Sequence, residues 1–469
     1  MMNNRNKELF KNTWLLGISN FSSKILVFLL VPIYTRALST SEYGFYDLTY
    51  TTIQLLFPIL TLDIYEGIMR FMMKDHQEDC EIFSIGLIYT ALGSLIFAIG
   101  LLVNSVGKIS TEVDNYSTLI WLYFVFYALN NLFIQFAKGL DKVLDMAIAG
   151  LIGTVCMVLG NVYFLLILKT KLTGFYIANI LGQAIPVLFL TVRLNTWKYV
   201  RIPRNKTLYK EITAYTIPLI LNTLGWWANN TSDRYIVSAI SGVSANGLIS
   251  VAYKIPNIIT AIGAIFLQAW QITVVKEYES NKRIVNYSDL FADFNAIFCA
   301  LSGILIIGNK FISSIIFAND FFAAWKFVPF LIISSLLNTN AGFLGPILSA
   351  EMNSKAMAKS ASWGIVINIA LNIILTLLIG PMGITIATAI ASFVIYYIRE
   401  KYTHDSVRSS KYYWILISWG LLTIVSVFSI LDIKLFYAIN IAIYLAILGI
   451  YKKSFKKIIT LVVSHIKRK

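Results

Sequence analysis

The run Ile82-Phe-Ser-Ile-Gly-Leu-Ile-Tyr-Thr-Ala-Leu-Gly-Ser-Leu-Ile-Phe-Ala-Ile-Gly-Leu-Leu-Val-Asn104 contains no charged residue. A helix needs about 20 predominantly apolar residues to cross the hydrocarbon core of a bilayer, so this stretch is long enough to span a membrane. Similar runs recur along the 469-residue chain, which is 57% hydrophobic and only 13% charged. A water-soluble fold could not bury so much apolar surface. The sequence therefore predicts an all-α polytopic membrane protein.

Fourteen stretches have the length and composition of a transmembrane helix. They lie at 12–36, 44–70, 82–104, 117–137, 147–168, 172–192, 211–240, 247–273, 289–308, 326–349, 360–380, 383–399, 412–431 and 434–451. The connections are short, which leaves no room for a large soluble domain. The first stretch is too long and too polar for a cleavable signal segment, so we expect it to be a retained helix.

Lysine and arginine are distributed unevenly among the connections. If both termini are cytoplasmic, the connections on that side hold most of the 39 basic residues. Basic loops are retained in the cytoplasm, so we expect an even number of spans with both termini there. The net charge of +15 then reflects topology. It does not indicate nucleic-acid binding, because the basic residues form no stripe with interleaved aromatic residues.

Two pairs of segments are similar to each other at nearly the same offset. Segment 37–50 aligns with 240–253, and segment 174–178 aligns with 383–387. Six spans separate the members of each pair, so the two halves have the same orientation. Weak internal similarity of this kind is typical of transporters. We expect two parallel six-helix repeats around a central cavity, followed by two C-terminal helices.

These repeats define the expected domains. An N-terminal six-helix lobe with its basic linker covers 1–205, and a C-terminal six-helix lobe covers 206–405. Two accessory helices and a lysine-rich tail occupy 406–469. We interpret the basic linker and tail as topology determinants near anionic lipid, with a specific partner site as the alternative.

Ionisable residues inside the predicted spans are functional candidates, because a charge in hydrocarbon costs at least a few kcal/mol. Lys24 lies midway along the first span, with Asn20 one turn earlier on the same face. We expect both to face a cavity, and a buried structural ion pair is the alternative. Arg234 and Lys254 are also within spans, where an interfacial position is the alternative. These three cations would offer contacts to an anionic group such as a pyrophosphate.

The predicted span 211–240 is polar for a membrane helix. Its polar and tryptophan residues share one broad face: Asn222, Trp226, Asn229, Asn230 and Asp233. We expect this face to line the path between the lobes. Asp233 and Arg234 are sequence neighbours that cannot face each other well, so each is expected to need another partner or water. The tryptophans are candidates for stacking on sugar rings, with packing against other helices as the alternative.

Three charged residues lie on one face at the end of the span 44–70. Asp63, Glu66 and Arg70 have i, i+3 and i+7 spacing. One interpretation is a salt-bridged interfacial face, and the other is a gate or a proton-titrating carboxylate. Pro58 can kink this helix, so the face that meets the cavity stays open.

The sequence offers little material for catalysis. Cys80, Cys156 and Cys299 lie far apart, and the three histidines fall in predicted loops. This arrangement lacks metal-ligand and nucleophile spacing, and no P-loop is present for ATP. We expect no enzymatic activity, no cofactor and no metal site.

Several loose motifs carry a family resemblance. They are Glu42-Tyr43-Gly44-Phe45-Tyr46, Asp63, Gly67, Arg70-Phe71, Asp233-Arg234-Tyr235, Gly247 and Ala252-Tyr253-Lys254. With them the chain resembles the bacterial polysaccharide flippases of the O-antigen (Wzx) type, within the multidrug, oligosaccharidyl-lipid and polysaccharide exporter superfamily.

The resemblance implies two six-helix lobes in a bacterial cytoplasmic (inner) membrane. The implied cargo is a polyprenyl-pyrophosphate-linked oligosaccharide, as an O-antigen, capsule or exopolysaccharide repeat unit, moved to the outer leaflet by alternating access. Membrane lipids, a polysaccharide polymerase and a chain-length regulator are the implied partners, and a proton or sodium gradient is a candidate energy source. The alternative functions are a cation-coupled small-molecule exporter and a polysaccharide polymerase.

Overall fold

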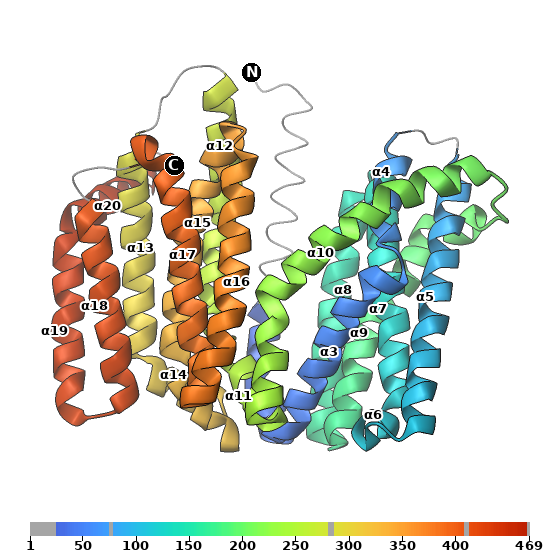
Figure 1. The fold of residues 1–469 in the computed structure, drawn as a ribbon, viewed down its shortest axis with the longest axis horizontal. Coiled ribbons are helices and arrows are strands. Elements are labelled where there is room, and N and C mark those ends of the chain that lie inside the picture. Colours follow the sequence, from blue (N-terminus) through green and yellow to red (C-terminus); the bar gives the residue numbers. More distant parts are fainter. Residues whose placement is uncertain (1–24, 75–77, 280–285, 408–411, 467–469) are drawn as a thin grey trace. The chain divides into compact units, whose positions relative to one another are not determined.

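The computed structural model describes residues 25–74, 78–279, 286–407 and 412–466 (Figure 1). Within these ranges every regular element is a helix, and there is no strand. Ten of the described helices are long and apolar enough to cross a bilayer, and two bent helix pairs bring the number to as many as twelve. The prediction of an all-α polytopic membrane protein is confirmed.

Each of the ten unbroken spans overlaps a predicted one. They are α5 (Asp79–Gly107), α7 (Ser117–Gly139), α8 with η2 (Val143–Ile167), α9 (Lys171–Leu194), α12 (Asn257–Glu279), α13 (Tyr287–Ile307), α15 (Val328–Ala350), α16 (Ser354–Ile379), α17 (Met382–Val407) and α18 (Tyr412–Leu431). The bent pairs are α3 (Thr40–Leu60) with α4 (Ile64–Met72), and α19 (Lys434–Ile450) with α20 (Lys452–Ile466).

The other predicted spans also have helical counterparts. The predicted span 211–240 lies within α10 (Lys206–Ser241). Because of its polar residues, α10 is not one of the ten helices that are apolar enough to cross a bilayer. The predicted span 247–273 is broken into α11 (Val243–Ala252) and α12, with Pro256 in the break. Only the end of the first predicted span, including α2 (Val31–Ala37), is described. Asn20 and Lys24 lie outside the described residues.

The chain forms two compact units, Met1–Thr231 and Ser232–Lys469. The division falls within α10, whereas the sequence places the lobe boundary just before this helix. The assignment of lobes to 1–205 and 206–405 stays a prediction.

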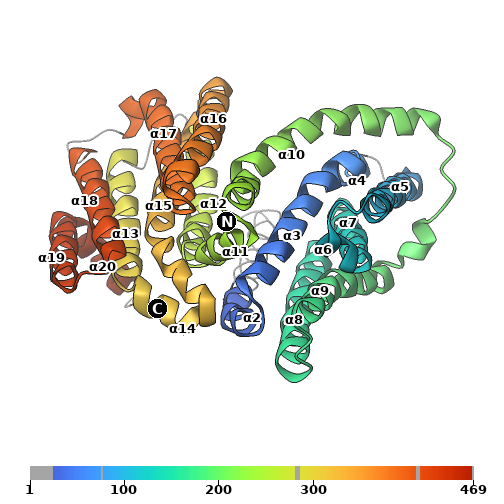
Figure 2. The same cartoon turned by 60° about the horizontal axis from the view of Figure 1, so that its bottom comes forward.

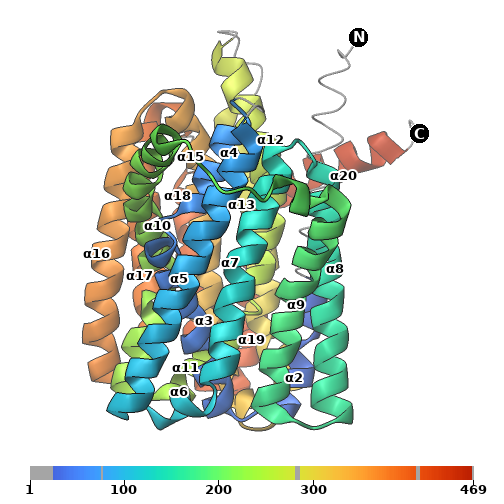
Figure 3. The same ribbon diagram turned by 90° about the vertical axis from the view of Figure 1, so that its right-hand side faces the viewer.

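In the first unit, α5, α7, α9 and α8 stand side by side in that order (Figure 3). The short helix α4 packs against α5 and α7 and buries Ile64, Ile68 and Met72, which share one face at i, i+4 and i+8. They belong to a cluster of buried residues that also includes Phe83 and Phe136. Because lipid tails are as apolar as these side chains, van der Waals packing holds this core together.

Helix α3 begins with a reciprocal cap. The Ser39 hydroxyl accepts from the Glu42 backbone N–H at 3.1 Å, and the Glu42 carboxylate accepts from the Ser39 backbone N–H at 2.7 Å. Such a capping box satisfies donors that the first turn leaves unpaired.

Ser39→Ala is expected to destabilise the folded protein by about 1 kcal/mol, because it removes this acceptor. Heating the detergent-solubilised protein should show a lower unfolding midpoint than that of Ser39→Thr, which keeps the hydroxyl. Equal midpoints for the two variants would show that the cap contributes nothing.

The second unit contains α11, α12, α13, α14 (Asn309–Ile316) and α15 to α20, among which α18 and α19 are the accessory helices. Helix α15 packs against α12, α17 and α18, while α13 packs against α18 and α19 (Figure 1). The Asn295 side chain of α13 accepts from the Trp419 indole at 2.8 Å and donates to the Tyr451 hydroxyl at 2.7 Å. These buried bonds attach the accessory helices to the rest of the unit, since leaving such groups unpaired in an apolar interior is costly.

Two glycines that align with each other in the sequence, Gly174 and Gly383, each lie where a Cβ atom would not fit. Gly174 lies near the start of α9, in close contact with Thr170 and Phe164, and Gly383 lies near the start of α17 against the backbone of α16. In each case a helical hairpin closes so tightly that a Cβ atom would overlap the preceding helix end. Both positions therefore lack room for a side chain, because Gly174 lies against side-chain atoms and Gly383 lies against backbone atoms.

Candidate functional site

The bent helix pair α3–α4 positions the first group of candidate residues. The two helices meet at 57°, and the backbone of Leu62 and Asp63 is left-handed, with φ of 52° and 53°. The break is closed by a 2.8 Å bond from the Asp63 backbone N–H to the Pro58 carbonyl. Left-handed backbone is costly for a non-glycine residue, and such strain is concentrated at functional sites.

Asp63 lies buried at this bend. Its Oδ2 accepts from the Thr223 hydroxyl of α10 at 2.9 Å, and its Oδ1 has no hydrogen-bond partner. The Tyr65 hydroxyl and the Glu66 carboxylate lie close enough to interact with it electrostatically. A buried oxygen without a partner costs about 1–3 kcal/mol. The site can therefore gain by accepting a proton or a ligand donor.

Glu66 and Arg70 have different surroundings. The Glu66 carboxylate accepts from the Gln135 carboxamide of α7 at 2.9 Å and interacts with Lys138. Arg70 is exposed, and among the described residues it makes no ion pair with either carboxylate. The structure therefore does not show the salt-bridged face that is one interpretation of the i, i+3, i+7 spacing.

A cavity of about 290 Å³ opens beside the bend. We call it the aromatic pocket, and it is lined by Gln54, Phe57, Pro58, Tyr65, Tyr127, Asn131, Thr223, Trp226, Trp227, Asn230 and Thr231. Helices α3, α4, α7 and α10 all contribute residues to this lining. The part of α10 that belongs to the first unit runs alongside α3 and α4 (Figure 2). The bend brings Gln54 and Tyr65, from the two sides of the break, into one site.

Of the residues that the sequence pattern singled out, Trp226 and Asn230 line this pocket, as does the neighbouring tryptophan Trp227, whereas most of the other walls were not predicted. Tyr127 and Asn131 are one helical turn apart on α7, and the seam continues to Gln135, which bonds Glu66. That i, i+4, i+8 polar spacing within an apolar span was the available signal. Asn229, also predicted to line the path, is half-buried, and the structure does not place it among the pocket walls.

A second group of candidates lies in the second unit. Asp233 is buried, and its carboxylate accepts from the Arg234 guanidinium at 2.8 Å and from the Tyr253 hydroxyl at 2.6 Å. The Arg234 guanidinium also lies 4.9 Å from the centre of the Tyr253 ring. The expectation that Asp233 and Arg234 cannot face each other well is wrong, because the two side chains form an ion pair, and Tyr253 is the further partner expected for Asp233.

Lys254 lies in the break between α11 and α12. It is half-buried and has no ion-pair partner among the described residues. Because Lys24 lies outside the described residues, the convergence of Lys24, Arg234 and Lys254 on one cargo stays a prediction.

Three basic residues that were not among the predicted site residues line a cavity of about 340 Å³ in the first unit. This basic pocket is lined by Arg36, Lys169 and Lys171, together with Ala37, Leu165 and Leu166. The sequence did contain a signal for this cluster. Basic residues are rare in the connections predicted to lie on the outer side of the membrane, and these three are among them. A cluster of cations in a small cavity favours an anionic ligand.

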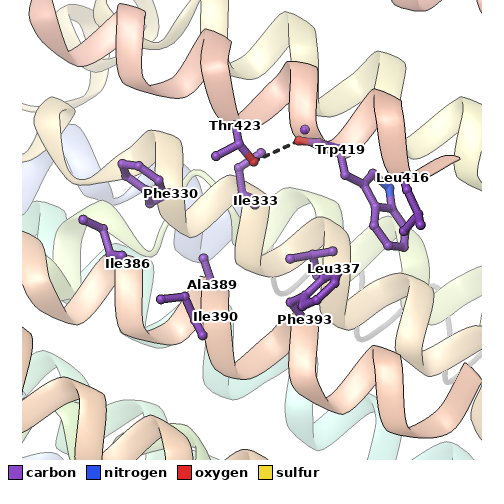
Figure 4. Close-up of a pocket in the computed structure, with 11 residues that line it drawn as sticks. Phe330, Ile333, Leu337, Ile386, Ala389, Ile390, Phe393, Leu416, Trp419 and Thr423 are labelled. Carbon is purple, nitrogen blue, oxygen red and sulfur yellow. Dashed lines mark hydrogen bonds between the residues drawn. The ribbon is translucent and has the colours of Figure 1, made fainter. Parts of the chain in front are cut away.

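An apolar pocket of about 470 Å³ lies in the second unit between α15, α17 and α18 (Figure 4). Phe330, Ile386 and Phe393 are among its walls. The one hydroxyl there, that of Thr423, donates to the Trp419 carbonyl at 2.9 Å within its own helix. The pocket therefore presents hydrocarbon without an unsatisfied donor. Within the described chain, no three His, Cys, Asp or Glu side chains gather as metal ligands would.

Known proteins share this fold. The structure is similar to "Lipid II flippase MurJ, inward closed conformation", with a TM-score of 0.69 and 15% identity over 95% of this chain and 99% of that chain. It is also similar to an inward-facing multidrug resistance MATE family transporter of the MOP superfamily, with a TM-score of 0.58 and 14% identity over 87% of this chain and 95% of that one. These similarities establish the fold and agree with the resemblance stated from sequence motifs.

The amino-acid sequence gives the family. No curated protein sequence matches the chain. Residues 9–271 match the family described as polysaccharide biosynthesis protein, and this match covers more than half of the 469 residues. The chain therefore belongs to the polysaccharide biosynthesis protein family.

Proposed function

We propose that this protein is a flippase that carries a polyprenyl-pyrophosphate-linked oligosaccharide from the cytoplasmic to the outer leaflet by alternating access. The observation that carries the proposal is the polysaccharide-biosynthesis family match on a chain whose fold is similar, over 95% of its length, to that of a lipid II flippase. The cargo would be an O-antigen, capsule or exopolysaccharide repeat unit. The protein would act in the bacterial inner membrane with both termini in the cytoplasm, and without covalent chemistry.

The described surfaces suit two parts of such a cargo. The basic pocket at Arg36, Lys169 and Lys171 suits a pyrophosphate, because clustered cations favour an anion. The apolar pocket around Phe330 and Phe393 suits a polyprenyl chain, because its walls offer hydrocarbon alone. A soluble anionic cargo has no hydrocarbon chain that could occupy the apolar pocket.

Energy coupling is proposed to involve the bend. Asp63 has an unsatisfied buried oxygen, and Glu66 lies one turn further along α4. A proton or a sodium ion bound there would remove the cost of the buried charge. The fold is shared with multidrug transporters, so a cation-coupled small-molecule exporter is the competing function.

Deletion of the gene tests the proposal in cells. Lipid-linked single repeat units should accumulate in the inner leaflet, and surface polysaccharide should disappear. Accumulation in the outer leaflet would instead indicate a polymerase. Resistance to cationic dyes with unchanged surface polysaccharide would indicate the exporter. A polymerase and a chain-length regulator are the proposed partners, and loss of either should leave flipping intact.

Lys254→Ala is expected to reduce the flipping rate about tenfold in proteoliposomes, which corresponds to about 1.4 kcal/mol. The lysine is half-buried and has no internal ion pair, so its charge is available to an anionic cargo. Lys254→Arg keeps the charge and should retain most of the rate. If the alanine variant flips at the wild-type rate, Lys254 does not contact the cargo.

A further inference from the structure

We propose that the aromatic pocket of the first unit binds one pyranose ring of the cargo's saccharide. This inference rests on the proposed flippase function and assigns the sugar part of the cargo to a site. The cavity of about 290 Å³ is at the small end of the range of ligand pockets, which begins near 300 Å³. That size suits a single ring better than a whole oligosaccharide.

The walls have the chemistry that a sugar ring requires. A pyranose has apolar C–H faces and a rim of hydroxyl groups, so it stacks on aromatic rings and bonds to amides at its edge. Five aromatic residues line the pocket: Phe57, Tyr65, Tyr127, Trp226 and Trp227. Three carboxamides and two hydroxyls complete the lining: Gln54, Asn131, Asn230, Thr223 and Thr231.

The inner rings are held in place before any ligand binds. The Trp227 indole donates to the Thr51 carbonyl at 3.0 Å. The Phe57 ring stacks on Tyr65 with centroids 5.0 Å apart and meets Tyr127 edge-on at 5.3 Å. Fixed walls lower the entropy cost of binding.

Trp226 differs from these rings. The residue is 66% exposed, and its indole N–H has no hydrogen bond in the described structure. A large aromatic ring with a free donor at the edge of a cavity is suited to cover one face of a ligand. We therefore assign Trp226 the role of the outer stacking platform.

The polar groups present acceptors to the cavity. The Asn131 and Asn230 amides donate to the carbonyls of Tyr127 and Trp226, at 2.8 and 2.7 Å, which leaves their side-chain oxygens for a ligand. The single proton of Thr223 is directed to Asp63 or to its own helix, so its hydroxyl accepts. Sugar hydroxyls can donate to all three groups.

The lining of the aromatic pocket does not suit the other two parts of the cargo, the pyrophosphate and the polyprenyl chain. No ionised side chain lines the aromatic pocket, so a pyrophosphate would lack a counter-charge there. Its amides and hydroxyls would leave a polyprenyl chain opposite unpaired polar groups. The basic and apolar pockets lack this combination of rings and amides. The aromatic pocket is therefore the surface that fits a neutral polyhydroxylated ring.

The test measures binding of two probes to the full-length protein in lipid nanodiscs. One probe is farnesyl pyrophosphate, and the other is farnesyl pyrophosphate carrying a single glucose, galactose or N-acetylglucosamine. The wild-type protein should bind at least one sugar-bearing probe more tightly than the sugar-free probe. Trp226→Ala should remove most of that difference, about tenfold in Kd, and leave the sugar-free Kd unchanged.

Two variants serve as controls, one that keeps an aromatic ring at position 226 and one that removes an exposed tryptophan elsewhere. Trp226→Phe keeps a ring and should retain part of the sugar-dependent affinity. Trp363→Ala removes a comparably exposed tryptophan, 51% exposed on α16 and outside the pocket, and should bind both probes like the wild type.

The outcomes separate this inference from the proposed function. If the wild-type protein binds farnesyl pyrophosphate but no sugar adds affinity, the sugar site is overturned and the flippase proposal stands. Equal weakening of both probes by Trp226→Ala also overturns the sugar site. If the wild-type protein binds neither probe, the proposed function itself fails.

Discussion

Asp63→Asn is expected to reduce flipping at least tenfold while the protein still inserts at its normal level. Asparagine has the same size, tolerates the left-handed backbone at φ 53°, and can still accept from Thr223. The substitution removes only the buried charge and its capacity to bind a proton or cation. If that capacity couples transport to a gradient, its loss stops the cycle without unfolding the bend.

Proteoliposomes with and without an imposed proton or sodium gradient provide the measurement. The gradient should accelerate the wild-type protein and have no effect on Asp63→Asn. The control is Asp145→Asn, which alters a buried carboxylate of the same unit that is already paired with Arg193 at 2.9 Å. If Asp63→Asn flips at the wild-type rate and responds to the gradient, Asp63 does not couple transport to it.

Gly383→Ala is expected to prevent most of the protein from accumulating in folded form. A Cβ atom at this position would overlap the backbone of Leu375 and Thr376, so no side-chain rotation can relieve the clash. Overpacking typically costs about 1–3 kcal/mol, and a backbone clash at a helical hairpin belongs at the upper end. We expect α16 and α17 to separate at this end.

Size-exclusion chromatography of the detergent-solubilised protein measures the loss. Gly420→Ala on α18 is the matched control, because a Cβ atom there meets open space and alanine favours the helix. A monodisperse Gly383→Ala protein with a wild-type unfolding midpoint would show that the hairpin adjusts freely, and the role assigned to this glycine would then be wrong.

The helices were predictable because length and apolar composition leave few alternatives in a bilayer. Runs such as 82–104 and 117–137 became α5 and α7 within a few residues. The break between α3 and α4 was only partly predictable. Pro58 indicated a kink, but the chain turns at Leu62 and Asp63, where left-handed backbone and the bond to the Pro58 carbonyl end the helix.

Local spacing was a poor guide to side-chain partners. The i, i+3, i+7 spacing of Asp63, Glu66 and Arg70 suggested mutual ion pairs, yet Thr223 and Gln135 from other helices bond the two carboxylates. Conversely, Asp233 pairs with its neighbour Arg234. Side-chain length and the approach of distant helices decide such contacts, and neither is visible in a spacing rule.

The sequence by itself determined that this chain is helical and has many segments able to cross a membrane, because bilayer thickness acts on each segment separately. The tertiary structure alone decided that Gln54, Tyr127 and Trp226, from three different helices, share one pocket beside a buried, half-satisfied Asp63. A pocket depends on where helices bend and which faces meet. Those are properties of packing between segments far apart in the chain.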